Sequence, residues 1–350
     1  MLERVAYLNA GTFGPLPRRT TDAMAERQRR NLAEGRSGAP YFEDVMEARA
    51  RLRARLAALI GADESTIALA TSTTEGCNAV VAGLRLRRGD EVVTTDVEHP
   101  GLLGALRAWA LDVKVARVRE EPASRALDVL RAAISPRTRL IALSHVAWTT
   151  GAVLPVRELA GSAIPVLVDG AQAAGAIAVD VEALGCDFYT VSGQKWLLGP
   201  DATGGLYVHR DRIEELEVSF PSYLSWEDAR ALEPWPDARR FESAFTPAAS
   251  VDGLLAALDF ADEVGEGRFE RARGMAERCR SLVADRAEVL TEPGQATLVS
   301  FRTRGPAEDI VRRLAERRVV VRDLPGLGWV RASCGFWTSE DDLERLVDAL

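Results

Sequence analysis

The chain has 350 residues, and its 44 basic residues against 52 acidic ones give a formal net charge of −8 and an isoelectric point near 5.2. This acidic balance argues against binding to nucleic acid or to an anionic membrane surface. With 47% hydrophobic and 27% charged residues, the composition is that of a globular protein rather than a disordered chain. Lys114 and Lys195 are the only lysines, so a mechanism that needs an amine nucleophile has two candidates.

Length and residue usage also bound the number of domains and the location. At roughly 150 residues per domain, the length predicts about two domains. No apolar run approaches the roughly 20 residues that span a bilayer, and the N-terminal MLERVAYLNAG lacks the pattern of a signal peptide. The four cysteines form no CxxC pair, and the three histidines show no zinc-ligand spacing. We therefore expect a cytoplasmic protein without a structural metal.

Helical and extended patterns alternate through the first two thirds of the chain. Helices are predicted at residues 20–34, 41–60, 74–86, 102–110 and 126–134. Strands are predicted at EVVTT, 113–118, 139–145, 164–169, 187–192 and 205–209. Strands that alternate with helices of about ten to fifteen residues indicate βα units. The predicted fold class is therefore α/β, with a mostly parallel sheet between helices.

The pattern changes after residue 236, where long helical stretches replace the alternation. Helical patterns cover 248–264 and 269–286, the segments LVSFRT, VVVRD and WVRASC are extended, and a helix over 339–350 starts at Ser339 as its N-cap. This order predicts a smaller α+β domain. We place the large domain at 17–236 and the small domain at 1–16 together with 237–350. The stretch 218–237, rich in proline and tryptophan, is the expected irregular connection.

Two polar residues follow neighbouring predicted strands. Asp169 ends the strand AIPVLVD, and α/β sheets bind ligands at the C-terminal ends of their strands. Its carboxylate is either the N-cap of a following helix or the partner of a cationic ligand group. Lys195 follows the next strand, in SGQKWLLGP, where apolar neighbours would lower its pKa and favour Schiff-base chemistry. The alternative for Lys195 is a solvated surface charge.

Two further segments also follow strand ends. The segment ATSTTEGCN places Thr73 and Thr74 at the start of a helix, as a phosphate cradle or as part of a simple capping box. His99, in DVEHP, is either a loop residue with its own partner or a ring that stacks on a planar cofactor. Together with Asp169 and Lys195, these features fit pyridoxal phosphate (PLP), whose enzymes use a lysine Schiff base and an acidic partner for the pyridine nitrogen.

The order of five segments carries a resemblance to a known family. With EHP, SHVAWTTG, VDGAQAAG, SGQKWLLGP and VRASCGFWTSEDDLERL, the sequence resembles the class V aminotransferase family of fold-type-I PLP enzymes over essentially its whole length. The resemblance implies that Lys195 forms the Schiff base and moves protons, that Asp169 keeps the pyridinium protonated and that His99 stacks on the ring. It also implies a homodimer with active sites near the interface.

The same resemblance implies roles for further residues. Gln172 would contact the ring hydroxyl, and the phosphate would be held by Thr73, Thr74, Ser192 and Gln194. Arg331 looks like the family arginine that forks the α-carboxylate of an amino-acid substrate, which suits its bidentate geometry. The other implied substrate contacts are Asn9 and Thr149.

Departures from the family pattern narrow the expected reaction. In the cysteine desulfurases of this family, a persulfide-forming cysteine lies shortly before the carboxylate-binding arginine, but residues 319–329 read VVVRDLPGLGW. Cys334 follows Arg331, and we expect it in the core. The most similar subgroup is that of cyst(e)ine C–S lyases and isopenicillin N epimerase-like proteins. We therefore expect C–S β-elimination on cysteine, cystine or an S-conjugated cysteine, with aminotransferase or epimerase as the alternatives. A non-catalytic regulator on the same fold is a further alternative.

Three positions differ from the family within the expected site. Thr149 stands where an asparagine commonly follows the tryptophan, which weakens the inferred contact with the ring hydroxyl. Gln194 stands where many relatives have histidine. Relatives also share RFExGT, whose threonine binds the phosphate of the partner subunit, whereas RFESAFT places Phe245 at that position. No phosphate contact is carried over to this segment.

Overall fold

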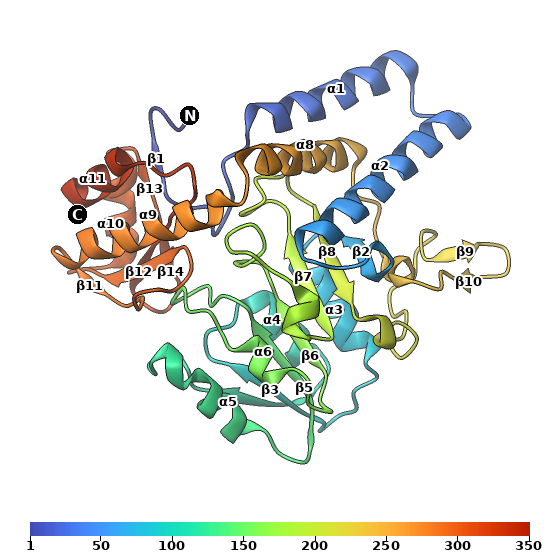
Figure 1. Ribbon diagram of the computed structural model, residues 1–350, viewed down its shortest axis with the longest axis horizontal. Coiled ribbons are helices and arrows are strands. Elements are labelled where there is room, and N and C mark those ends of the chain that lie inside the picture. The colour runs from blue at the N-terminus through green and yellow to red at the C-terminus, as the bar shows by residue number, and fades with distance from the viewer.

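The computed structural model describes residues 1–350 and contains two sheets of different size (Figure 1). The larger sheet has the order β2-β8-β7-β6-β5-β3-β4, and β8 runs antiparallel to both of its neighbours while the other six strands share one direction. Its strands are β2 (Ile67–Ala70), β3 (Glu91–Thr95), β4 (Asp112–Ala116), β5 (Thr138–Ser144), β6 (Val166–Asp169), β7 (Phe188–Ser192) and β8 (Gly204–Val208). The α/β class and the mostly parallel sheet are thus confirmed.

Helices cover both faces of this sheet. They are α1 (Arg18–Glu34), α2 (Gly38–Leu59), α3 (Thr73–Gly83), α4 (Pro100–Ala108), α5 (Ala126–Ala133), α6 (Val156–Leu159), α7 (Val181–Leu184) and α8 (Ala248–Val264). Alternate residues of each strand point to opposite faces. Ile141 and Leu143 therefore pack with α2, α5 and α8, whereas Leu140 and Ala142 pack with α3 and α4. This double burial explains why the strands are apolar almost throughout.

The second unit is built on a four-stranded antiparallel sheet with the order β11-β12-β15-β14. Its elements are α9 (Gly267–Ala284), β11 (Glu288–Val289), β12 (Leu298–Arg302), α10 (Ala307–Glu316), β14 (Arg322–Leu324), β15 (Trp329–Ser333) and α11 (Glu340–Ala349). The N-terminal strand β1 (Ala6–Tyr7) joins this unit by pairing with β13 (Val319–Val320). Ser339 caps α11 in a full capping box with Asp342, as its sequence predicts. Cys334 lies in the core of this unit, also as expected.

Helix α8 shows how the two units meet. It has the predicted bounds, but its Val251, Leu254 and Leu258 pack into the core of the seven-stranded sheet, and it lies along α1 (Figure 1). The hydrophobic core of the smaller unit begins only with α9. A boundary at residues 236/237 stays a prediction, and the packing of α8 favours a division near Gly265.

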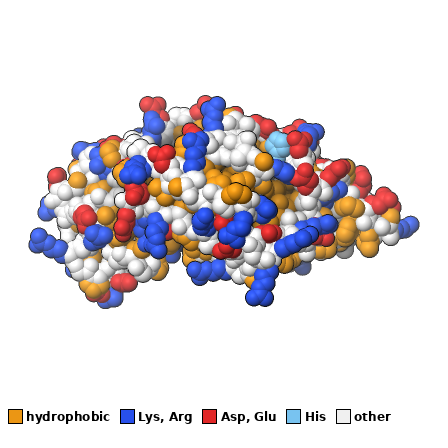
Figure 2. Space-filling model, turned by 90° about the horizontal axis from the view of Figure 1, so that it is seen from below, with side chains coloured by type: hydrophobic (Ala, Val, Ile, Leu, Met, Phe, Trp, Pro, Cys, Tyr) orange, Lys and Arg blue, Asp and Glu red, His pale blue; other side chains and the backbone are white.

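The connection at residues 218–237 is partly regular. Strands β9 (Trp226–Asp228) and β10 (Glu233–Pro234) form a short antiparallel hairpin that projects from the body of the molecule (Figure 1). No helix in the chain combines the length and the apolar character needed to cross a membrane. On the face shown in Figure 2, acidic and basic side chains are interspersed around an apolar strip.

Candidate functional site

Five strand ends meet at one edge of the seven-stranded sheet. The strands β2, β3, β5, β6 and β7 run in the same direction, so the segments that leave them start from the same side. The register aligns Ser144 of β5, Asp169 of β6 and Thr190 of β7 across neighbouring strands. These strand ends place His99, Trp148, Asp169 and Lys195 around a common edge, which is where sheets of this kind bind ligands.

Asp169 is 5% exposed at the end of β6. Its Oδ1 accepts a hydrogen bond from the backbone N–H of Ala171 at 2.9 Å, and its Oδ2 accepts none from the protein. The next helix begins only at Val181, so the alternative of a helix N-cap is wrong. A buried carboxylate with one free oxygen needs a partner, which leaves Oδ2 available to a cationic ligand group.

Lys195 is half-buried just beyond β7. Burial lowers its pKa to about 8, although the charge of Asp169 opposes this shift, and the charges of Arg331 and Arg322 reinforce it. The other lysine, Lys114, is exposed on β4 with its Nζ 3.7 Å from a Glu91 carboxylate oxygen. Lys195 is therefore the lysine whose amine is deprotonated more readily, as a Schiff-base nucleophile requires.

His99 lies between β3 and α4, where it caps the helix. Its Nδ1 accepts a hydrogen bond from the N–H of Gly101 at 3.1 Å, so the proton of the neutral ring sits on Nε2. Burial, followed by the charge of Lys195, lowers the pKa of His99. The ring also meets the indole of Trp148 edge-on, with centroids 5.2 Å apart. His99 therefore has a hydrogen-bond partner of its own and borders the site, whereas stacking of its ring on a cofactor stays a prediction.

The predicted phosphate-binding residues follow the ends of β2 and β7, two strands that are separated in the sheet by β8. Thr73 and Thr74 are the first residues of α3, whose N–H groups have no acceptor within the helix. The hydroxyl of Ser72 caps this helix by accepting from the N–H of Glu75. On β7, the hydroxyl of Ser192 donates to the side-chain oxygen of Gln194 at 2.8 Å. Ser72 is thus the N-cap, but the capping box is incomplete because Glu75 accepts from the N–H of Thr71 instead of that of Ser72. The first helical N–H groups are left free for an anion.

Gln172 lies behind the site rather than free within it. Its side-chain nitrogen donates to the carbonyl of Gly11 at 2.8 Å, and its oxygen accepts from the indole N–H of Trp196 at 2.9 Å. These two bonds tie the N-terminal segment to the residue that follows Lys195. A contact between Gln172 and a ring hydroxyl stays a prediction.

Arg331 is fully buried on β15, in the smaller unit. Its Nη1 donates to the carbonyl of Trp148 at 2.7 Å, whereas its Nε and Nη2 have no partner. These two nitrogens form one edge of the guanidinium, the edge that binds a carboxylate side-on. Burial lowers the pKa of Arg331 to about 9, and the charge of Arg322 lowers it further. A side chain at Gly11 would come within 2.7 Å of Nη2, so glycine leaves room for this arginine.

Arg322 is a site residue that the sequence did not single out. It pairs directly with Arg331 across β14 and β15, and both guanidinium carbons lie within 6 Å of the Trp148 ring. Its Nη1 donates to the hydroxyl of Thr12 at 3.2 Å, and that hydroxyl donates to the side-chain oxygen of Asn9 at 2.8 Å. The available signal was an arginine in the extended segment VVVRD beside a second arginine in WVRASC. This signal places Arg322 beside Arg331 only when the antiparallel register of β14 and β15 is known.

Glu98 is a second residue that sequence reasoning missed. It is 4% exposed, and its carboxylate accepts from the N–H and hydroxyl of Ser144 at 2.9 and 2.5 Å and from the hydroxyl of Thr95 at 2.6 Å. Burial raises its pKa to about 7, against the effect of these hydrogen bonds. Its position next to His99 in the sequence gave no sign that it would be buried behind Asp169 and Ser144.

The remaining candidate residues divide between the site and the surface. Thr149 is buried, and its hydroxyl has no partner. The tryptophan and tyrosine side chains of the 218–237 connection pack locally instead: Tyr223 stacks on Phe245 with centroids 6.4 Å apart, and Trp235 lies under the guanidinium of Arg239. Trp235 is therefore part of the local packing of this region, whereas Tyr223 stays largely exposed.

The buried donors without partners test whether a ligand belongs here. The unpaired groups are the Nε and Nη2 of Arg331, the indole N–H of Trp148 and the hydroxyl of Thr149. Buried polar groups are usually paired, so a cluster of unpaired ones marks a place for a polar ligand. With the free carboxylate oxygen of Asp169 and the low-pKa amine of Lys195, this donor set fits PLP and an amino-acid substrate.

Comparison with known proteins gives the family. The family model for "Aminotransferase class-V" matches residues 6–346. The chain belongs to the class V aminotransferase family. Isopenicillin N epimerase of Streptomyces clavuligerus is 34% identical over 384 residues, which cover 99% of this chain and 94% of that protein. A probable cysteine desulfurase of Methanothermobacter thermautotrophicus is 30% identical over 390 residues, which cover 100% of this chain and 95% of that protein.

Solved structures of class V enzymes agree with this assignment. The cystine C–S lyase C-DES, in complex with its reaction product cysteine persulfide, superposes with a TM-score of 0.92 at 30% identity, covering 99% of this chain and 97% of the lyase. Another structure of that lyase holds glycine linked to PLP, also with a TM-score of 0.92. This chain is therefore a PLP-dependent class V enzyme of fold type I.

Proposed function

We propose that this class V enzyme cleaves the C–S bond of cysteine, cystine or an S-conjugated cysteine by β-elimination. The observation that carries the proposal is the pair of facing arginines, Arg322 and Arg331, beside Lys195. Two guanidinium groups without a carboxylate partner suit a substrate with two carboxylates, as cystine has. The similarity to a cystine C–S lyase supports the same substrate class.

Each residue of the site has a task in this reaction. The free edge of Arg331 binds the α-carboxylate side-on, and Arg322 binds a second carboxylate further along the substrate. Burial lowers the pKa of Lys195 from 10.5 to about 8, so a larger share of its amine is neutral near pH 7 than in an exposed lysine, and the neutral amine accepts the α-proton. Asp169 holds a proton on the pyridine nitrogen through its free Oδ2, and the first N–H groups of α3 with Ser192 and Gln194 hold the phosphate. When bound, PLP supplies an electron-accepting ring that stabilises negative charge at the substrate Cα.

The turn before Arg331 supports elimination over a persulfide route through the enzyme. Strands β14 and β15 are joined by the residues Pro325 to Gly328, and none of them is a cysteine. The four cysteines Cys77, Cys186, Cys279 and Cys334 are all buried in the protein. Elimination from cystine needs no enzyme thiol, because the sulfur leaves on the small product.

Epimerisation is the second candidate, and aminotransfer is the third. Epimerisation is favoured by the 34% identity to isopenicillin N epimerase over almost the whole chain. Both reactions begin, like elimination, with removal of the α-proton by the same lysine. The site geometry supports that first step for all three reactions.

Product analysis of the holoenzyme distinguishes these reactions. With L-cystine, elimination yields pyruvate, ammonia and a released sulfur compound in equal amounts. Aminotransfer instead requires a keto-acid acceptor, and epimerisation changes optical rotation and exchanges the α-hydrogen with solvent deuterium while releasing no ammonia. Exchange or racemisation without pyruvate, across cysteine, cystine and S-conjugates, would overturn the elimination proposal.

We also propose that the protein acts as a homodimer in the cytoplasm. Several large apolar side chains are exposed on the N-terminal segment, α2 and the connection region: Phe13, Phe42, Phe220, Tyr223 and Leu232. Large exposed apolar residues in one region are typical of interaction surfaces. Light scattering coupled to gel filtration tests this proposal, and a monomer of 38.0 kDa at micromolar concentration would contradict it.

A further inference from the structure

The loop from Trp148 to Gly151, which follows β5 of the large sheet, is held by the smaller unit. Each of its four backbone carbonyls accepts a hydrogen bond from that unit. The donors are Nη1 of Arg331 to Trp148 at 2.7 Å, the hydroxyl of Ser300 to Thr149 at 2.5 Å, the hydroxyl of Thr291 to Thr150 at 2.7 Å and the N–H of Ala296 to Gly151 at 3.3 Å. The smaller unit therefore helps to fix the position of this loop, although the loop emerges from the large sheet.

Two of these donors, Ser300 and Thr291, form a connected pair. Ser300 lies directly opposite Arg331 on the neighbouring strand β12. Its backbone N–H donates to the hydroxyl of Thr291 at 2.8 Å. A hydroxyl has a single proton, and accepting from Ser300 leaves that of Thr291 directed at the Thr150 carbonyl. Both side chains are buried, at 0% and 6% exposure, so water does not replace these bonds.

The close approach of the loop to β12 depends on a glycine. Gly151 has a φ of 75°, a left-handed conformation that other residues rarely adopt. A side chain there would also come within 2.5 Å of the Leu298 carbonyl. Further along, the backbone N–H of Val153 donates to the side-chain oxygen of Gln295 at 2.9 Å. The loop is thus seated against residues 291–300 along its whole length.

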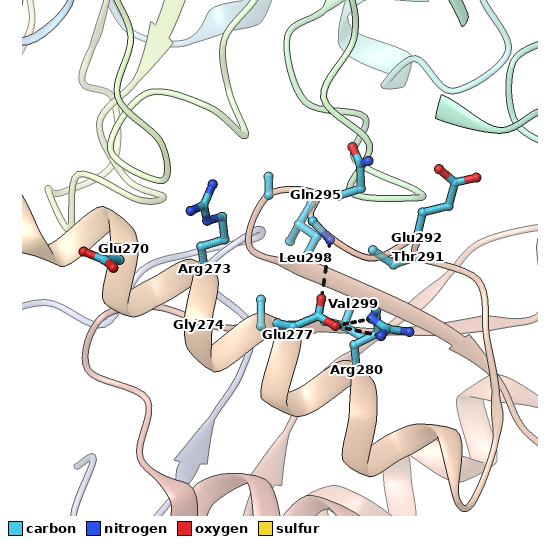
Figure 3. A pocket seen from close by; sticks show the side chains of 13 residues that line it. Glu270, Arg273, Gly274, Glu277, Arg280, Thr291, Glu292, Gln295, Leu298 and Val299 are labelled. Carbon is cyan, nitrogen blue, oxygen red and sulfur yellow. Dashed lines mark hydrogen bonds and ion pairs between the residues drawn. The ribbon is translucent and has the colours of Figure 1, made fainter. Parts of the chain in front are cut away.

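A pocket lies on the side of residues 291–299 that faces α9. A cavity of about 460 Å³ separates α9 from residues 291–299, and Thr291, Gln295 and Leu298 line it (Figure 3). Gln295 points away from α9, whereas Glu277 and Arg280, one turn apart on α9, pair with each other, and Glu277 also accepts from the N–H of Gly294 at 3.4 Å (Figure 3). Residues 291–300 are therefore held against the loop by these hydrogen bonds and by a buried apolar cluster that joins Ala296 and Leu298 to Val146 and Trp196.

We propose that Ser300 and Thr291 are positioning residues for substrate binding, which fix Trp148 and Thr149 in register with Arg331. Trp148 borders both arginines and His99, and the neighbouring Thr149 carries a buried hydroxyl without a partner. Strand β12 holds this loop with the hydroxyl of Ser300 and holds Arg331 through the strand pairing. The four-stranded sheet therefore fixes the positions of both Arg331, which would donate to the substrate carboxylate, and the indole of Trp148. The inference rests on the proposed function for the identity of the substrate but not for the role of the hydroxyls.

Variants that remove a single hydroxyl test this role in the holoenzyme. Ser300→Ala and Thr291→Val each delete one donor with little change in volume, and Thr291→Ser keeps the hydroxyl. We expect Ser300→Ala and Thr291→Val to raise KM for L-cystine about 10-fold, as for a lost buried hydrogen bond. We expect kcat to change less than about 3-fold, and Thr291→Ser to restore the wild-type KM. Thr297 is the matched control, because it is fully buried nearby and its hydroxyl has no partner, so Thr297→Val should leave KM unchanged.

Hydrogen–deuterium exchange separates the positioning role from the identity of the substrate. The amides of Ala147, Gly151 and Leu154 are hydrogen-bonded within the loop region. Ser300→Ala should speed their exchange several-fold without changing exchange in β6 or β7, whether or not the enzyme accepts cystine. Unchanged exchange in this loop would overturn the positioning role. A wild-type enzyme that ignores cystine, with loop exchange still accelerated in the variant, would instead contradict only the proposed function.

Discussion

The two halves of the site differ in how their charged groups are satisfied. At the edge of the seven-stranded sheet, the two acids and the histidine accept hydrogen bonds from the protein: Asp169 from Ala171, Glu98 from Ser144 and Thr95, and His99 from Gly101. On the four-stranded sheet, Arg322 and Arg331 face each other without any carboxylate within ion-pair distance. The acids of the first half are partly or fully hydrogen-bonded by the protein, with Oδ2 of Asp169 left free, whereas the arginines of the second half lack an anion.

This difference indicates how the two ligands are bound. The sheet edge is an organised surface that needs only one cationic group opposite Asp169 and one anion at the start of α3. The arginine pair instead carries like charges in a buried place, and this lowers the pKa of both Arg331 and Lys195. A carboxylate between the arginines relieves that repulsion. We therefore expect substrate binding to raise the pKa of Lys195, whereas residues on the sheet edge respond little.

The largest effect is expected from Lys195→Ala, which removes the nucleophile of the sheet half. The visible absorption band of the lysine-bound cofactor should disappear, and turnover should fall by about 10²–10⁴-fold or more. Lys114→Ala is the control, because Lys114 is exposed far along β4 and pairs only with Glu91. A Lys195→Ala protein that keeps the band would show that another amine holds PLP.

Arg331→Ala comes next and tests the substrate half. This change deletes a buried guanidinium that donates to the substrate α-carboxylate. It should raise KM for every accepted amino acid by about 100-fold, near 3 kcal/mol. The absorption band of the bound cofactor should remain, because the sheet half stays intact. Steady-state kinetics give KM, and absorption spectra report the cofactor. Arg302→Ala is the matched control, since Arg302 lies on neighbouring β12 but is exposed and paired with Glu288. Unchanged KM in Arg331→Ala would remove this arginine from the site.

The contrast between the halves also explains what the sequence could predict. Asp169 and Lys195 each follow an apolar strand directly, so the motif alone places them at the same sheet edge. The bounds of α8 follow from its local pattern in the same way. Arg322 has no such local signal, because its place beside Arg331 depends on how β14 pairs with β15. Long-range contacts likewise determine that α8 packs against α1 and that Ser300 lies beside Thr291.

Glu98→Gln tests whether a buried acid behind the sheet half is protonated in the folded protein. Burial raises the pKa of Glu98 in the folded protein to about 7, above the ordinary value of 4.5 for a glutamate. The folded state therefore binds more protons than the unfolded state between these values, and the stability from this group is present below pH 4.5 and lost as pH rises through 7. From pH 5 to pH 8, the wild-type free energy of unfolding should fall relative to Glu98→Gln by on the order of 3 kcal/mol.

Urea denaturation of the apoprotein at several pH values measures this difference. Glu91→Gln is the control with the opposite sign, because hydrogen bonds from Thr138 and Ser135 lower the pKa of Glu91 below 4.5. Its contribution is lost only as pH falls below that range, so its difference from the wild type should stay constant from pH 5 to pH 8. Parallel curves for the wild type and Glu98→Gln would contradict a protonated Glu98.

The smallest and most selective effect is expected from Arg322→Gln. Arg322 is half-buried and donates a hydrogen bond to Thr12. Its loss should weaken the binding of a substrate's second carboxylate by about 10-fold, near 1.4 kcal/mol. KM should rise for L-cystine but stay within about 2-fold for L-cysteine, which has one carboxylate and needs only Arg331. Equal losses for both substrates would show that Arg322 acts through Arg331 and Trp148 rather than on the distal carboxylate. The four-stranded half would then contain a single anion site at Arg331, which the charge of Arg322 supports.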